Sequence, residues 1–183
     1  ALGRAQARAV GQRLQHMGVD RLVSSDLGRT RETSGIIAGY TGHAVQWDAR
    51  LRERHYGVLE GLNVKEILAR HADVYRQLKT EDPDFEIPGG ESHRQHYHKN
   101  IPVIEAFANE TPGTTTVLVA HGGVLENVFR YVSGLELGRP RCVLPVNASL
   151  SIIQYGMFYG STRWIIKTWG DAAHLEKISQ PDR

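Results

Sequence analysis

Apolar residues recur at helical spacing in several parts of the chain. The first of these stretches places one face on Leu2, Ala5, Ala9, Val10, Leu14 and Met17. Gly18 ends this predicted helix. Further helices are predicted over residues 27–37, 64–79, 91–108 and 124–132. Glycines at 39–42 end the second helix, Pro102 is a kink or an early boundary in the fourth, and Gly134 follows the last.

Short apolar runs alternate with these helices and predict strands over residues 19–23, 44–47, 116–119, 146–155 and 163–168. The last two runs are joined through Gly156 and Gly160 and are typical of a hairpin. Residues 48–61 and 81–90 are polar and rich in turn residues, so we expect loops there. The alternation predicts an α/β fold, a three-layer α/β/α sandwich with a mostly parallel central sheet and helices on both faces.

Composition defines the broad class of protein. The 183 residues are 40% hydrophobic and 23% charged, and we expect them to form one globular domain over 1–183. The net charge of +2 is too small to indicate nucleic acid or a membrane as a partner. Cys142 is the only cysteine, which excludes an intrachain disulfide and fits a reducing compartment such as the cytoplasm.

The beginning of the chain is unusual. It starts at Ala1 without methionine and runs almost directly into a helical pattern. No apolar run has transmembrane length, and no signal-peptide pattern is present. We expect the native N-terminus to be missing from this sequence. A targeting segment upstream of Ala1 is therefore compatible with it.

His121 is the first candidate for chemistry. An apolar run over 116–120 ends in this histidine, and Gly122, Gly123 and a new helical pattern follow. Ligands of open α/β sheets bind outside the carboxyl ends of strands. The glycines would let the backbone approach a ligand, and the helix start offers N–H groups to an anion. The alternative is a histidine that merely ends a strand.

Arg29 and Glu53 are the next candidates. Arg29 lies in the first turn of a helix that also follows a strand, where a guanidinium can bind phosphate or carboxylate. The alternative is an exposed, solvated helix. Glu53 lies in a loop rich in functional groups, and a carboxyl with a raised pKa there could protonate a leaving oxygen. A surface cluster of ion pairs explains the same loop equally well.

Other polar residues are weaker candidates. Glu91 follows two glycines and is explained by a helix N-terminus. His93 and His96 could share a helix face, but His98 points elsewhere and no carboxylate completes a metal set, so we expect no metal. Cys142 has no catalytic histidine near it in the sequence and is expected to be inert.

Four segments in this order resemble the histidine phosphatase superfamily, also called the phosphoglycerate mutase-like family, in its phosphatase-type branch. They are residues 24–30 (SSDLGRT), 51–57 (LRERHYG), 88–92 (PGGES) and 120–123 (AHGG). A helix of small residues precedes them, as in the family. The resemblance covers nearly the whole chain, and four motifs in register make an accidental match improbable.

The resemblance implies a mechanism through phosphohistidine, in which a histidine attacks phosphorus and is transiently phosphorylated. Arg29 matches a phosphate-clamping arginine, His121 matches the second histidine, which holds a phosphate oxygen, and Glu53 matches the proton donor. Asn147 resembles an asparagine near the family's pocket. The site expected from the resemblance consists of Arg29, Glu53, Tyr56, His121, Gly122 and Asn147.

The chain departs from the family at one essential point. The family's nucleophile lies in an Arg-His-Gly motif after the first strand, and this sequence contains no Arg-His-Gly. Arg54 and His55 are followed by Tyr56 and belong to the Glu53 loop. We therefore expect the nucleophile, one clamping arginine and the first strand to lie upstream of Ala1.

Three functions are compatible with these residues. The segment between the Glu53 loop and Gly89 is compact, which resembles the family's phosphatases and favours a phosphomonoester phosphatase acting on a small phosphorylated metabolite. Phosphoglycerate mutase is the alternative, with 2,3-bisphosphoglycerate as its cofactor. A phosphate-binding domain without catalysis is the third. The phosphatase needs no cofactor and would be insensitive to EDTA, and the sequence leaves a homodimer open.

Overall fold

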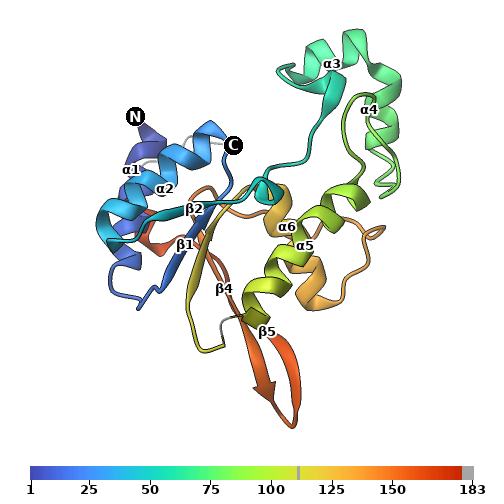
Figure 1. Ribbon diagram of the computed structural model, residues 1–183. Coiled ribbons are helices and arrows are strands. Elements are labelled where there is room, and N and C mark those ends of the chain that lie inside the picture. Colours follow the sequence, from blue (N-terminus) through green and yellow to red (C-terminus); the bar gives the residue numbers. More distant parts are fainter. Residues whose placement is uncertain (111, 179–183) are drawn as a thin grey trace.

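A parallel sheet of three short strands forms the centre of the molecule (Figure 1). The structure is a computed structural model that describes residues 1–110 and 112–178. The strands β1 (Arg21–Ser24), β2 (Val45–Trp47) and β3 (Thr116–Val119) lie in the order β2-β1-β3. Val23 of β1 stands opposite Gln46 on one side and Leu118 on the other.

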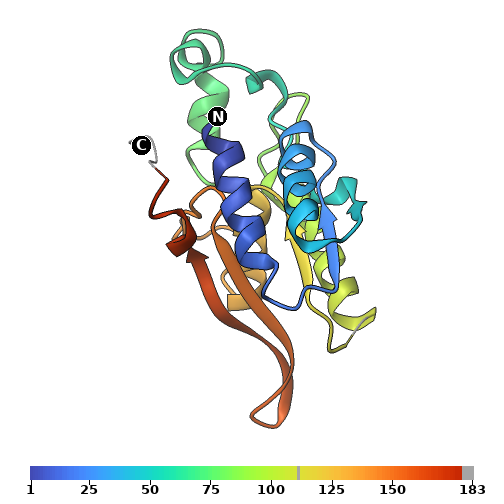
Figure 2. The same ribbon diagram turned by 90° about the vertical axis from the view of Figure 1, so that its left-hand side faces the viewer.

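Helices cover both faces of this sheet, on its two sides in Figure 1, and Figure 2 looks onto one of these faces. Leu22 packs with α1 (Leu2–Leu14) and α2 (Gly28–Thr41), whereas Val23 packs with α5 (His93–Glu110) and α6 (Gly122–Ser133). Successive strand residues point to opposite faces, so these two neighbours contribute to two separate hydrophobic clusters. The predicted α/β sandwich with a parallel sheet between two helical layers is confirmed.

A long antiparallel hairpin continues the layer beyond β3. It consists of β4 (Leu150–Phe158) and β5 (Ser161–Asp171), which form a second, separate sheet. Ile153 of β4 packs in the same cluster as Leu118 of β3, and Leu150 packs with Val117 on the opposite face. The predicted hairpin is confirmed, but Gly156 lies inside β4 rather than in the connection.

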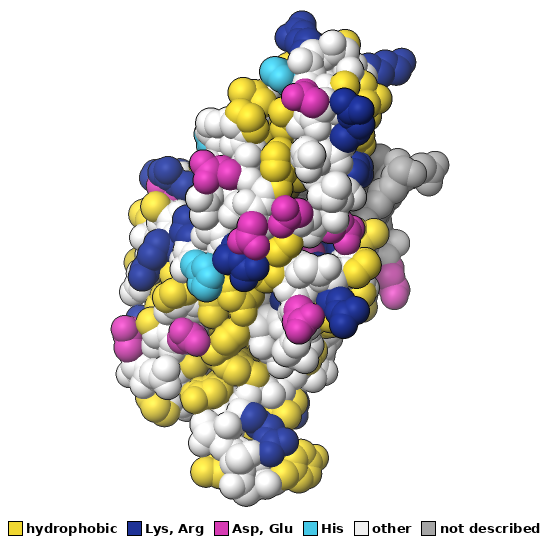
Figure 3. Space-filling model, turned by 90° about the vertical axis from the view of Figure 1, so that its right-hand side faces the viewer, with side chains coloured by type: hydrophobic (Ala, Val, Ile, Leu, Met, Phe, Trp, Pro, Cys, Tyr) yellow, Lys and Arg dark blue, Asp and Glu magenta, His cyan; other side chains and the backbone are white. Residues whose placement is uncertain are grey.

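The end of the hairpin is exposed and apolar. Met157 is 70% exposed and Tyr159 is 93% exposed. In Figure 3 hydrophobic side chains form a band on this face of the molecule that leads to the hairpin end. A homodimer, which the sequence leaves open, is not decided by this exposed surface.

The segment between the Glu53 loop and Gly89 projects from the rest of the molecule (Figure 1). It holds α3 (Val64–Arg70) and α4 (Ala72–Leu78) instead of the single predicted helix over 64–79, because the backbone at His71 leaves the helical region with φ −141° and ψ 42°. A small cluster of Leu59, Val74 and Ile87 anchors α4. No residue of α3 is buried.

Two helix ends differ from the prediction. The helix α2 continues through Gly39 to Thr41 and ends only where Gly42 adopts a left-handed φ of 74°. The helix α5 runs through Pro102 to Glu110, and Ile101, Val103 and Ile104 on either side of the proline are buried. Burial of the apolar side chains therefore outweighs the local preference of glycine and proline to end a helix.

None of the described helices has the length and apolar character needed to cross a bilayer.

Single-turn 3-10 helices complete the element list. They are η1 (Ala49–Leu51), η2 (Gly57–Leu59) and η3 (Ala173–Leu175). The first two belong to the Glu53 loop, which packs tightly against residues 88–91. A Cβ atom added to Gly90 would lie 2.5 Å from the carbonyl oxygen of His55, and one added to Gly57 would lie still closer to the carbonyl oxygen of Pro88.

We expect Gly90→Ala to lower the free energy of unfolding by about 2 kcal/mol, because a methyl group at this position forces two backbones apart. Gly35→Ala is the matched control, since Gly35 lies inside α2 with open space around its Cα. That change should raise stability by about 0.5–1 kcal/mol. Urea unfolding measures both effects, and equal stability of the two variants would contradict the tight packing of the loops.

Candidate active site

The site is built where β1 and β3 end at the same edge of the sheet. Ser25 directly follows β1, and its backbone N–H donates to the carbonyl of Val119 at the end of β3. The chain then enters α2 after one strand and α6 after the other. His121 is the N-cap residue of α6, in an extended conformation with φ −128°. The parallel pairing therefore brings two strand-to-helix connections together, as the sequence predicts.

His121 is buried, with 6% of its surface exposed, and both ring nitrogens have partners. The Arg29 guanidinium donates from Nε to Nδ1 of His121 at 3.1 Å. The ring nitrogen Nε2 lies 2.8 Å from the hydroxyl oxygen of Ser25. Because Nδ1 accepts a hydrogen bond, the ring proton belongs on Nε2, which then donates to Ser25.

Burial, and secondarily the nearby Arg29 cation, lowers the pKa of His121 from 6.5 to about 4. The imidazole is therefore neutral at physiological pH. A neutral imidazole with its proton on Nε2 is a hydrogen-bond donor without a charge. This state suits a residue that holds a phosphate oxygen.

Arg29 supplies the positive charge at this edge. Its side chain is exposed in the first turn of α2, and among residues 1–110 and 112–178 no carboxylate pairs with it. The two carboxylates closest in sequence are paired elsewhere. Asp26 forms a two-point ion pair with Arg52, with both hydrogen bonds 2.6 Å long, and Glu32 pairs with Arg4. The Arg29 guanidinium is thus left with hydrogen-bonding capacity for an anion.

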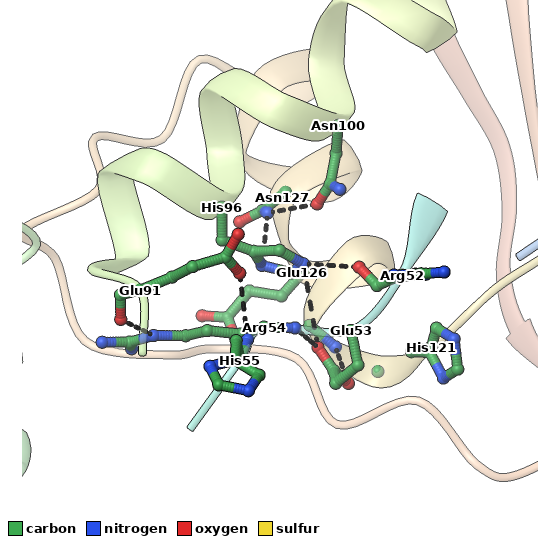
Figure 4. Close-up of polar contacts among 12 residues, drawn as sticks. Arg52, Glu53, Arg54, His55, Glu91, His96, Asn100, His121, Glu126 and Asn127 are labelled. Carbon is green, nitrogen blue, oxygen red and sulfur yellow. Dashed lines mark hydrogen bonds and ion pairs between the residues drawn. The ribbon is translucent and has the colours of Figure 1, made fainter. Parts of the chain in front are cut away.

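The carboxyl group of Glu53 lies at the N-terminus of α6, near His121 (Figure 4). One oxygen accepts the backbone N–H of Arg54 at 2.9 Å, and the other accepts the backbone N–H of Gly123 at 3.0 Å. A Cβ atom on Gly123 would collide with Glu53 Oε1. Gly123 therefore makes room for the carboxyl of Glu53 rather than for a ligand, which the sequence alone did not reveal.

Glu91 has a structural function in this loop. Its carboxylate accepts hydrogen bonds from the backbone N–H of His55 at 2.9 Å and from Lys99 Nζ at 2.6 Å. Glu91 precedes α5, which begins at His93, so the ion pair with Lys99 rather than the helix terminus holds it. The 88–92 motif thereby ties the Glu53 loop to α5.

The structure brings together only part of the predicted site. Arg29, Glu53, His121 and Gly122 meet at the edge of the sheet. Tyr56 is 37% exposed beneath the Arg54 guanidinium, and partial burial raises the pKa of its hydroxyl. Asn147 is exposed in the loop before β4. Within the described residues no hydrogen bond links either side chain to Arg29, Glu53 or His121.

Ser25 was not among the predicted site residues, although it contacts His121 directly. The sequence does contain a signal for Ser25, because this residue lies between a strand and the helix that carries Arg29. Within the described residues no three His, Cys, Asp or Glu side chains are arranged to hold a metal ion. The site therefore offers a cation, a neutral imidazole, a carboxyl group and a helix N-terminus.

The sequence model of the histidine phosphatase superfamily (branch 1) matches residues 1–172. The chain belongs to this superfamily. The family that the four motifs indicate is thus confirmed, and with it the class of enzyme, a phosphatase or a phosphoglycerate mutase-like protein.

Individual relatives are similar over most of their length. The chain is 33% identical to a probable phosphoglycerate mutase GpmB of Escherichia coli O1:K1 and 36% identical to that of Citrobacter koseri. Both alignments cover 96% of this chain and 82% of the relative. A mycobacterial glucosyl-3-phosphoglycerate phosphatase, solved with inorganic phosphate, superposes with a TM-score of 0.80 at 32% identity. That match covers 94% of this chain and 87% of the phosphatase.

We expect the His121 ring to titrate with a pKa of about 4. Arg29→Gln should raise this pKa, because it removes a cation that opposes protonation, whereas Arg31→Gln on the same helix should not. Chemical shifts of the imidazole in NMR spectra, followed against pH, measure both effects. A ring that titrates near 6.5 in the unmodified protein would contradict the buried geometry.

The same shift determines how stability depends on pH. The unfolded chain takes up a proton on this histidine near pH 6.5, whereas the folded chain does so only near pH 4. The stabilising contribution of neutral His121 is therefore complete above about pH 6.5 and is lost as the pH falls toward about 4.

Proposed function

We propose that this protein hydrolyses phosphomonoesters of small metabolites through a phosphohistidine intermediate. The observation that carries the proposal is the convergence of Arg29, His121 and Glu53 at one edge of the sheet. Phosphoryl transfer needs charge neutralisation at the phosphoryl oxygens and a proton for the leaving oxygen. Arg29 and the α6 N-terminus supply the first, joined by the Nε2–H of His121 when it turns from Ser25 to the phosphoryl oxygen, and Glu53 supplies the second.

The nucleophile in this proposal is a histidine outside the sequence described. It attacks phosphorus, the bond from phosphorus to the ester oxygen breaks, and Glu53 gives its proton to that oxygen. Water then attacks the phosphohistidine and gives a proton to the Glu53 carboxylate. The bond from phosphorus to the histidine nitrogen breaks, so phosphate leaves and both the histidine and the acid are restored. His121 is not proposed as the nucleophile, because its Nδ1 accepts from Arg29 and its Nε2 carries the ring proton.

The free edge of β3 supports a further strand that brings the nucleophile. Within the described residues β3 pairs with β1 alone, and all four of its residues are only half-buried. By contrast Leu22, Val23 and Ser24 of β1 are buried. Both hydrophobic clusters continue from β3 to β4, although the two strands belong to separate sheets. A strand paired in parallel with β3 would end at the edge that carries His121.

The short segment between the Glu53 loop and Gly89 favours hydrolysis over mutase activity. A mutase must keep water away from its phosphohistidine, whereas a phosphatase must admit it. The only projecting segment between the Glu53 loop and Gly89 is the short α3–α4 pair, in which α3 buries no residue. Phosphoglycerate mutase is the second candidate, because the curated relatives carry that name. Derivatives of phosphoglycerate are therefore the first substrates to test.

We expect the complete encoded protein to release phosphate from p-nitrophenyl phosphate faster than it interconverts 3- and 2-phosphoglycerate. Addition of EDTA should leave the rate unchanged, because protein cations neutralise the phosphoryl group. Faster interconversion than hydrolysis would establish the mutase instead. Binding of inorganic phosphate without any turnover would establish a domain that binds a phosphorylated ligand only.

We expect Glu53→Gln to reduce kcat/KM by about 100-fold for an alkyl phosphate, whose leaving oxygen needs a proton. The loss should be much smaller for p-nitrophenyl phosphate, whose leaving group departs as an anion. Glu60→Gln is the matched control, since the Glu60 carboxylate lies in the same loop but contacts the backbone N–H of Tyr56 and the ring of His55. Equal slowing of both substrates would remove Glu53 from the role of acid.

A further inference from the structure

A network of buried polar side chains lies directly behind Glu53, between α5 and α6 (Figure 4). Asn100 and Asn127 are completely buried, and His96 is 1% exposed. They lie beside an apolar cluster that includes Val103, Ile104 and Val124. Burying such polar groups is costly unless each is hydrogen-bonded. None of the three has a part in the chemistry described above.

The hydrogen bonds of this network determine how the Asn127 amide is oriented and which ring nitrogen of His96 carries the proton. The side-chain nitrogen of Asn127 donates to Nδ1 of His96 at 3.1 Å and to the side-chain oxygen of Asn100 at 2.8 Å. The side-chain oxygen of Asn127 lies 2.9 Å from Nε2 of His93. These partners fix the orientation of the Asn127 amide. They also place the proton of the His96 ring on Nε2.

The network ends on the backbone that leads into Glu53. Nε2 of His96 donates to the carbonyl of Arg52 at 3.0 Å. The side-chain nitrogen of Asn100 donates to the carbonyl of Arg50 at 2.5 Å. Leu51 between these two carbonyls is fully buried. Three consecutive residues before Glu53 are therefore held against α5.

Other contacts of this segment hold it less firmly. The side chains of Arg50 and Arg52 form ion pairs with Asp48 and Asp26, and both guanidinium groups are at least half exposed. Exposed ion pairs contribute little to a fixed geometry. The buried hydrogen bonds to the two carbonyls are therefore the stronger constraint on the backbone before Glu53.

We infer that His96, Asn100 and Asn127 are positioning residues that fix the Glu53 carboxyl beside His121. The inference rests on the proposed role of Glu53 as the acid. The helix α6 then holds Glu53 in two ways, directly through the N–H of Gly123 and indirectly through Asn127 and His96. Nε2 of His96 also lies only 3.9 Å from Glu53 Oε1, so a shift of the ring displaces the carboxyl.

The first test compares two substrates that differ in leaving group. We expect His96→Leu to lower kcat/KM by about tenfold or more for an alkyl phosphate and by less than about threefold for p-nitrophenyl phosphate. His96→Gln should keep the ratio of the two kcat/KM values close to that of the unmodified protein, because the glutamine side-chain amide can donate to the Arg52 carbonyl. Should His96→Leu fail to fold, Asn100→Ala leaves His96 in place and removes the hydrogen bonds of Asn100 to Arg50 and Asn127. This variant should change the ratio of the two kcat/KM values in the same direction.

Val128→Ala is the matched control. Val128 follows Asn127 on α6 and is 7% exposed, but it packs in the apolar cluster. It should lower stability and leave the ratio between the two substrates unchanged. Equal slowing of both substrates in His96→Leu, or the same change of ratio in Val128→Ala, would overturn the inference.

The second test does not require activity. The backbone N–H of Gly123 lies in the first turn of α6, and its acceptor is Glu53 Oε2. We expect His96→Leu to speed hydrogen exchange of this amide about tenfold relative to the Leu125 amide, which donates to the carbonyl of His121. Unchanged exchange at Gly123 would overturn the inference. Faster exchange in a protein that hydrolyses no phosphomonoester would support the positioning network and reject the proposed function.

Discussion

The parallel pairing of β1 with β3 joins two segments that are far apart in the chain, and the site follows from it. Val23 stands opposite Leu118, so the two strands end together. Each strand then turns into a helix, which places Arg29 and His121 within hydrogen-bonding distance. A slip of one residue in this pairing would turn the apolar side chains of one strand to the wrong face and separate the two groups.

The N-terminus of α6 is the second point on which the site depends. His121 caps this helix, and Gly123 donates its N–H to Glu53. Four residues further along the helix, Asn127 organises the network that reaches the backbone before Glu53. One helix therefore carries the His121 imidazole, a hydrogen-bond partner for the Glu53 carboxyl group and the buried side chain that supports this loop. A helix start also favours anions, which suits a phosphorylated ligand.

Charge is distributed unevenly around the site. Most nearby ionic groups neutralise one another, as Asp26 does with Arg52 and Glu91 with Lys99. Arg29 differs from them, because in the described part of the chain it contacts an imidazole instead of a carboxylate. Burial keeps that imidazole neutral, so the positive charge at the edge of the sheet comes from the guanidinium. This arrangement combines a cation with a neutral imidazole, the pair that the proposed phosphatase would use.

The sequence by itself determined the α/β fold, the order of the elements and the identity of Arg29, Glu53 and His121 as candidates. Those features depend on local signals, such as apolar periodicity and a polar residue at the end of a strand. It also indicated the family, because four motifs occur in one order.

Only the tertiary structure decided how these residues are used. Gly123 makes room for Glu53, Ser25 partners His121, and Glu91 holds a loop rather than a helix end. His96 and Asn127 come from different helices, so their spacing in the sequence gives no sign of the hydrogen bond between them. Such contacts arise from the packing of distant segments, which periodicity and turn residues do not encode.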